Sequence, residues 1–195
     1  MRGPRSRFLR GLGDKRAALT ESSGYLTVFV RLPNQIASRN STAAEGSHME
    51  KELIKVGQLE VVFLATKGDT DGHADVFELR VPAGAKVPGA HHHVGMDEVI
   101  TGLEGVLTYV VGDRVFEVGP GDHAVSPRGV RHYFVNRTDR PARALVVGTP
   151  ATLGPEYFRE IAAVAAGGGP PDMQKIAGVM RKYGLEPQPL PAGFG

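Results

Sequence analysis

Four side chains in this sequence have the types and spacing that would bind a metal ion. His91, His93 and Glu98 lie in the segment GAHHHVGMDEVITGLEG, and His132 lies further along in GDHAVSPRGVRHYFVN. Imidazole nitrogens and carboxylate oxygens are common ligands of first-row divalent metals. If the fold brings the two segments together, they form a metal site, and one divalent ion is the expected cofactor.

The first segment predicts two ligands on one strand face. Alternate side chains of a β-strand point the same way, so His91 and His93 share a face while His92 points away. Residues 94–97 have the pattern of a turn. Glu98 then begins an apolar run that predicts the antiparallel partner strand, which would place its carboxylate beside the two histidines.

The second segment predicts a turn followed by a strand. Pro127 and Gly129 favour the turn, and the residues that follow them have strand character. On that strand His132 shares a face with Val130 and Phe134, which is an apolar setting for a metal ligand. Incidental histidines in an unrelated β-protein remain the alternative at this stage.

Both segments resemble the two sequence motifs of the cupin superfamily. The first family motif is HxH, three or four residues, a glutamate, six residues and a glycine. The second is a glycine, five residues, PxG, two residues, a histidine, three residues and an asparagine. Gly84 lies one residue further upstream than the glycine that usually leads the first motif. The matching positions are His91, His93, Glu98 and Gly105 in the first motif, and Gly121, Pro127, Gly129, His132 and Asn136 in the second.

The resemblance implies an all-β fold, the double-stranded β-helix or jelly-roll barrel. Fifteen residues, 106–120, separate the motifs, and they read as a hairpin on the two-residue turn Gly112–Asp113, as in compact bacterial single-domain cupins. The segments 59–66, 74–82 and 142–150 also have strand character.

The implied activity is less specific than the implied fold. The sequence looks most like the quercetin-dioxygenase-like group, whose activity is metal-dependent oxidative cleavage of an enol or diketone, so an oxidoreductase is expected. A Lewis-acid isomerase or decarboxylase, a noncatalytic cupin that binds or senses a small molecule, and a barrel with an empty site remain alternatives. The ligand set does not decide between Fe, Mn, Ni, Co and Zn. Glu98 is also the candidate catalytic base, and Tyr109, Arg128 and Phe134 are candidate substrate-pocket residues.

Composition excludes several other classes of protein. The chain has no cysteine, which rules out disulfides, thiolate metal sites and a cysteine nucleophile. No apolar run is long enough to span a bilayer, so a soluble, cytoplasmic protein without a membrane partner is expected. The net charge of +2 comes from residues 1–48, which carry eight Lys or Arg against three acids, and this pattern does not indicate nucleic-acid binding. A small-molecule ligand is the expected partner, and the resemblance adds an expected homodimer.

Three regions are predicted along the chain. Residues 1–48 are interpreted as a disordered leader, outside the functional unit. Gly46 to Met49 also resembles the remnant of a cleaved expression tag, and a misassigned start codon would look similar. Residues 49–152 are predicted to form the barrel, and residues 153–195 a helical tail.

Apolar periodicity predicts two helices in that tail. One covers residues 155–166, and the other begins after Asp172 and ends near Gly184. We expect the pair to pack on the outer face of the barrel or on a second subunit, since an apolar helical stripe usually belongs to a core. A lid over the ligand is the less favoured alternative.

Overall fold

The computed structural model describes residues 16–22, 25–31, 52–87, 89–166 and 172–190. The chain divides into two compact units, Met1–His48 and Met49–Gly195. Within the first unit, β1 (Arg16–Ser22) and β2 (Tyr25–Arg31) pair as antiparallel strands. The expectation of disorder across residues 1–48 did not include this hairpin. The rest of that stretch lies outside the described residues, and its interpretation as a leader stays a prediction.

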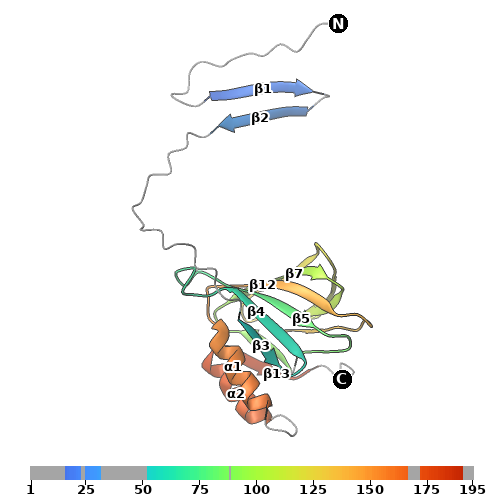
Figure 1. The fold of residues 1–195 in the computed structure, drawn as a ribbon, viewed down its shortest axis with the longest axis vertical. Helices are drawn as coiled ribbons and strands as arrows, with labels where there is room; N and C mark the ends of the chain where they lie inside the picture. Colours follow the sequence, from blue (N-terminus) through green and yellow to red (C-terminus); the bar gives the residue numbers. More distant parts are fainter. Residues whose placement is uncertain (1–15, 23–24, 32–51, 88, 167–171, 191–195) are drawn as a thin grey trace. The chain divides into compact units, whose positions relative to one another are not determined.

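The second unit is built from two β-sheets with two helices beside them (Figure 1). The six-stranded sheet has the order β10-β7-β12-β5-β4-β3, and the five-stranded sheet has the order β13-β6-β11-β8-β9. The predicted all-β jelly-roll fold with a helical C-terminal part is confirmed. The elements are β3 (Leu53–Val56), β4 (Leu59–Ala65), β5 (Asp75–Val81), β6 (Ala90–His93), β7 (Asp97–Glu104), β8 (Leu107–Val111), β9 (Arg114–Val118), β10 (His123–Ser126), β11 (His132–Val135), β12 (Ala142–Thr149), α1 (Gly154–Ala165), α2 (Met173–Lys182) and β13 (Leu185–Gln188).

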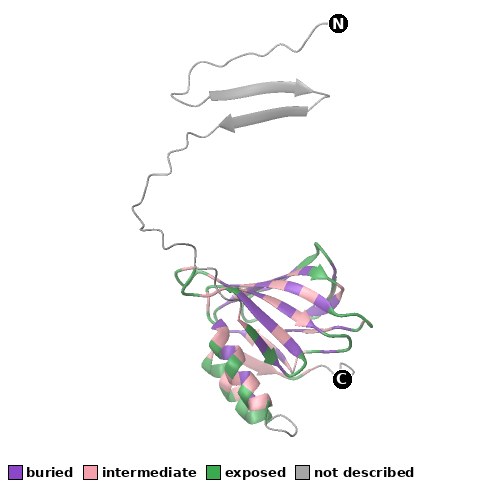
Figure 2. Ribbon diagram, viewed as in Figure 1, coloured by how far each residue is buried: buried purple, intermediate pink, exposed green. Residues whose placement is uncertain are grey.

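Alternating side chains place the core between the two sheets. In β5 and β12 every second residue is buried, and the residues between them are partly exposed (Figure 2). The period-two pattern of a half-buried strand explains this alternation. The hairpin predicted between the two motifs is also present as β8 and β9, which pair antiparallel. Its turn residue Gly112 has a φ of 59°, a conformation that glycine adopts at little cost.

One predicted strand pairing is wrong. β6 and β7 are not antiparallel partners, because β6 lies in the five-stranded sheet and β7 lies in the six-stranded sheet. The side chain of Met96, in the short connection between them, is fully buried. It also contacts the residue just before the tail, since Thr152 Oγ1 lies 3.2 Å from its sulfur. The connection is therefore tied to the core and joins two sheets instead of closing a hairpin.

Both predicted helices are present, and their starts are fixed in different ways. Asp172 caps α2, and its carboxylate accepts hydrogen bonds from the backbone N–H groups of Gln174 and Lys175. Helix α1 has no side-chain cap of its own. Instead, the buried carboxylate of Asp75 on β5 accepts hydrogen bonds from the Leu153 and Gly154 N–H groups. A carboxylate here also interacts favourably with the helix dipole.

The tail also contains a strand that the sequence did not predict. β13 pairs antiparallel with β6, so the end of the tail extends the five-stranded sheet beside the histidine-bearing strand. The segment is only four residues long and includes Pro187, a residue that is rare inside strands. Within the described residues, no helix combines the length and apolar character needed to cross a membrane.

Candidate metal centre

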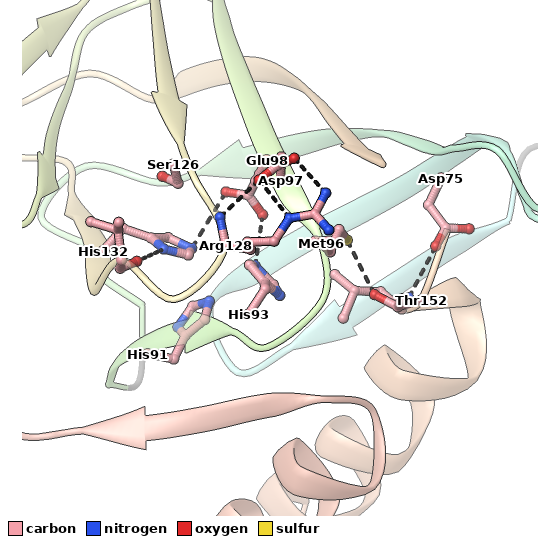
Figure 3. Close-up of polar contacts among 12 residues, drawn as sticks. Asp75, His91, His93, Met96, Asp97, Glu98, Ser126, Arg128, His132 and Thr152 are labelled. Carbon is pink, nitrogen blue, oxygen red and sulfur yellow. Dashed lines mark hydrogen bonds and ion pairs between the residues drawn. The ribbon is translucent and has the colours of Figure 1, made fainter. Parts of the chain in front are cut away.

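Three histidines from two neighbouring strands converge in the second unit. His91 and His93 lie on β6, and His132 lies on β11, where it is the direct cross-strand partner of His91. The ring centroids are 4.5 Å apart for His91 and His132, 5.0 Å for His93 and His132, and 5.2 Å for His91 and His93. One nitrogen from each ring lies within 4.8 Å of the other two. Figure 3 shows the three rings gathered at one point.

Glu98 approaches this group from the opposite sheet. One of its carboxylate oxygens, Oε2, lies 3.3 Å from His93 Nε2, and the other, Oε1, lies 3.7 Å from His132 Nε2 (Figure 3). The structure therefore brings all four predicted ligands together. It does so through a β6–β7 connection that joins two sheets, and not through the predicted hairpin.

The ring nitrogens are arranged to bind a metal ion and not to hydrogen-bond to one another. Nδ1 of His132 lies 3.1 Å from the Val130 carbonyl, and Nδ1 of His91 lies 3.3 Å from the Gly89 carbonyl. With Nδ1–H donating to a carbonyl, Nε2 of each ring has a free lone pair. Among the described residues, His132 Nε2 and both ring nitrogens of His93 are buried and find no hydrogen-bond partner. Burying such groups costs free energy, which a divalent ion would offset.

Burial also keeps these rings in the form that binds metal. It lowers the pKa of His91 to about 3, with a further contribution from the neighbouring His132 and His93. Burial likewise lowers the pKa of His132, although the charge of Glu98 opposes that shift. Since only a neutral imidazole has a lone pair to offer, metal binding does not have to displace a proton from either ring near neutral pH.

A tyrosine and a serine orient the carboxylate of Glu98. The Tyr109 hydroxyl donates a hydrogen bond of 2.8 Å to Glu98 Oε1 and lies 2.9 Å from Ser126 Oγ. Burial and then the charge of Glu98 raise the pKa of Tyr109 well above its ordinary value, so the phenol keeps its proton. For Glu98 itself, burial alone would raise the pKa, but contact with His93 and the nearby His132 and His91 hold it well below its usual range.

Residues 77–148 match the family model described as "Cupin domain". Over these residues the chain resembles the cupin superfamily, and its jelly roll is a cupin fold. The part that matches the family model contains all four candidate ligands and the whole of both motifs. Membership of the quercetin-dioxygenase-like group, the homodimer and the cytoplasmic location stay predictions.

Solved structures that resemble this cupin come from several bacteria. A sugar phosphate isomerase from a cupin superfamily, of Silicibacter pomeroyi, is 37% identical over 50% of this chain, with a TM-score of 0.43, and this chain covers 62% of its length. A Thermus thermophilus protein is 30% identical, with a TM-score of 0.39, over 40% of this chain and 74% of that chain. The polyketide cyclase RemF from Streptomyces resistomycificus is 28% identical, with a TM-score of 0.46, over 51% of this chain and 74% of that chain. No curated protein matches this cupin.

Two motif residues that are not candidate ligands have structural roles in this cupin. The fully buried amide of Asn136 lies within hydrogen-bond distance of the carbonyls of Val81, Pro82 and Arg140, and so ties two connections together. Gly105 has a φ of 64°, and a Cβ there would lie only 2.4 Å from the Pro141 carbonyl oxygen. Only glycine fits this close approach.

The histidines open onto a cavity of about 150 Å³. Its wall comes from both sheets and from both helices of the tail, including Tyr157 and Met180. The tail was predicted to pack on the outer face of the barrel or on a second subunit, and its apolar face also forms part of the cavity wall. Sequence periodicity marked that face as apolar without indicating what it covers.

The three predicted pocket residues have different positions. Tyr109 and Phe134 lie on the cavity wall. Arg128 is not among the lining residues, and its side chain is 53% exposed. Its guanidinium forms an ion pair with Asp97, with 2.7 Å between Nη2 and Oδ2, and its backbone N–H donates to the same carboxylate (Figure 3).

Proposed function

We propose that this cupin is a metal-dependent enzyme that acts on a small, largely apolar molecule bearing oxygen donors. Its most favoured reaction is the oxidative cleavage of an enol or a diketone. The observation that carries this proposal is the composition of the cavity wall. Three histidines and Glu98 occupy one part of the wall, and most other lining residues are apolar.

The charge of the wall favours some substrates over others. Among the described lining residues there is no lysine and no arginine. A phosphate group away from the histidines would lose its hydration without gaining a cationic partner, which costs several kcal/mol at least. An enol, a phenol or a diketone places its polar atoms close together and leaves an apolar body for the wall. That distribution matches the cavity.

The metal and the protein would contribute different parts of the chemistry. When bound by His91, His93, His132 and Glu98, a divalent ion supplies a Lewis-acidic or redox-active centre with further positions open to oxygen ligands. The surrounding apolar wall excludes water from the bound molecule.

Glu98 is the group of this chain best placed to move a proton. Its carboxylate is ionised near neutral pH, and Tyr109 occupies Oε1. If Glu98 leaves the ion when substrate binds, Oε2 is the atom that would accept the hydroxyl proton of an enol. The hydrogen bond from Tyr109 would keep the carboxylate in place while it does so.

The first test is the metal content of the chain, purified without chelators, followed by an assay of oxygen uptake. We expect close to one divalent ion per chain, and oxygen uptake with a small β-diketone or a flavonol. The double variant His91→Ala/His93→Ala should lose both, and Glu98→Gln should lose far more turnover than binding.

Three other results would change the proposal in defined ways. Metal and turnover without oxygen uptake would favour a Lewis-acid isomerase or decarboxylase. Metal and tight ligand binding without turnover would favour a noncatalytic binding protein. No metal, even after reconstitution, would contradict every metal-centred function.

A further inference from the structure

The tail helix α1 places a tyrosine on the wall of the metal-site cavity. Tyr157 lies one turn into the helix, is only 9% exposed and lines the same cavity as the three histidines and Glu98. Its ring packs edge-on against Phe158 and Tyr183, with centroids 4.9 and 5.5 Å away. These contacts hold the ring, so the hydroxyl has a fixed direction.

The hydroxyl of Tyr157 has no hydrogen-bond partner among the residues that the structure describes. Two other polar side chains on the wall differ in this respect, since Tyr109 bonds Glu98 and Ser126, and the amide of Gln188 lies 3.4 Å from His92 Nδ1. The Tyr157 hydroxyl is not one of the fully buried unpaired atoms of the described residues, so its oxygen keeps accessible surface and can reach a bound molecule. Such a group on the wall of an apolar cavity is suited to a bound molecule that supplies an acceptor.

The electrostatics of Tyr157 agree with this position. Burial, and then the negative charge of Glu98, raise the pKa of Tyr157 above its ordinary value. The hydroxyl is therefore a donor at neutral pH, and it lies within the electrostatic influence of the metal site. The sequence pattern does not indicate this role, because Tyr157 belongs to an apolar helical stripe whose usual function is packing.

We propose that Tyr157 is a substrate-binding residue whose hydroxyl donates a hydrogen bond to an oxygen of the molecule held in front of the three histidines. This inference rests on the proposed function and adds to it a selection for ligands with an acceptor oxygen at that place. The helical tail is then part of the substrate site as well as of the fold. A ligand that lacks the acceptor would leave the hydroxyl unpaired and would bind more weakly.

The test compares Tyr157→Phe with the matched variant Tyr183→Phe in the full chain loaded with Co²⁺. Tyr183 is a suitable control because it packs against Tyr157, but its hydroxyl donates to Glu160 and it is not a lining residue. Two probes are titrated into each protein and followed by the visible spectrum of the cobalt. Acetylacetone has acceptor oxygens, whereas imidazole bound through its lone pair presents only an N–H.

In Tyr157→Phe we expect the Kd for acetylacetone to rise about tenfold and the Kd for imidazole to change less than about twofold. Metal content and Tm should stay the same, since the variant removes a hydroxyl that has no hydrogen-bond partner among the described residues and leaves the ring in place. Tyr183→Phe should leave both affinities within about twofold of the wild type.

Two failures are distinguishable. If Tyr157→Phe binds acetylacetone as tightly as the wild type, the inference about Tyr157 is overturned while the proposed function stands. If the wild type binds neither cobalt nor acetylacetone, the proposed function is overturned, and this inference with it.

Discussion

Two polar clusters in this cupin are built on opposite principles. On the six-stranded sheet, Glu78 accepts hydrogen bonds from Arg80 Nε at 2.7 Å and from Arg143 Nε and Nη2 at 2.9 and 3.0 Å. Arg143 also contacts Glu104. These side chains complete one another's hydrogen bonds and remain partly in water.

The cluster around the three histidines is not complete in this way. It contains one carboxylate and three rings, and three of the ring nitrogens are buried without a hydrogen-bond partner in the part of the chain that the structure describes. The difference indicates which polar cluster needs a ligand. A set of charges that pair with one another can serve the fold alone, whereas buried groups without partners usually mark a functional site.

Removing one histidine should produce the largest effect. In His93→Ala we expect metal affinity to fall more than about 100-fold, because loss of a direct ligand exceeds the usual effect of losing a supporting group. Elemental analysis and a competition titration with a chelator measure this change. The matched control is His92→Ala, which alters the neighbouring position on the other face of β6. Equal metal content in the two variants would mean that the histidines do not form the site.

Removing the hydrogen bond from Tyr109 should have an intermediate effect on metal affinity. Tyr109→Phe leaves Glu98 Oε1 without its donor, and we expect metal affinity to fall about tenfold. Thr108→Val is a suitable control, since Thr108 is the next residue of β8 and bonds Glu117 instead. Full metal affinity in Tyr109→Phe would show that Tyr109 supports the core and not the carboxylate.

The cluster around Glu78 should have a smaller effect than the histidine cluster, and it should affect only the stability of the fold. The arginines hold the pKa of Glu78 at about 2, chiefly through the hydrogen bonds from Arg143 and against the effect of burial. Because the folded-state pKa lies below the ordinary value of 4.5, the stabilisation is fully present above pH 4.5 and is lost as the pH falls toward 2. We expect Glu78→Gln to lower the free energy of unfolding by about 1 kcal/mol at pH 7.

Urea unfolding of Glu78→Gln and the wild type at pH 7 and at lower pH checks that prediction. The difference between the two proteins should shrink as the pH falls toward 2, and metal content should be unaffected. Glu104→Gln is the control, because Glu104 pairs with the same Arg143 but is more exposed, so its effect should be smaller. A difference that is the same at every pH would contradict the predicted role of the Glu78 charge.

The sequence predicted the ligands better than it predicted how they meet. The HxH spacing and the PxG turn depend on local strand geometry, which a sequence pattern carries, and His91, His93 and His132 lie where that geometry requires. Glu98 reaches them through a change of sheet. That path depends on where the buried Met96 anchors the connection, which strand periodicity does not encode.

The C-terminal tail shows the same limit of prediction from the sequence. Its two helices follow from apolar periodicity and from the Asp172 cap, but an amphipathic stripe does not specify the surface that it covers. Tyr157 was assigned to packing for this reason. Arg128 was assigned to the pocket from its place in the second motif, although its actual partner, Asp97, lies 31 positions earlier in the chain. Contacts between residues so far apart in sequence are set by the tertiary fold.

The anchoring of α1 by Asp75 has a consequence for how this protein can change. One carboxylate on β5 fixes the start of the tail, while the metal-facing side chains belong to β6, β7 and β11. The reactive centre and the helical part of the cavity wall are thus carried by separate stretches of the chain. Substitutions confined to α1 and α2 would therefore change the cavity wall while the four candidate ligands stay in place, which makes the tail the natural target for altering the proposed selectivity by design.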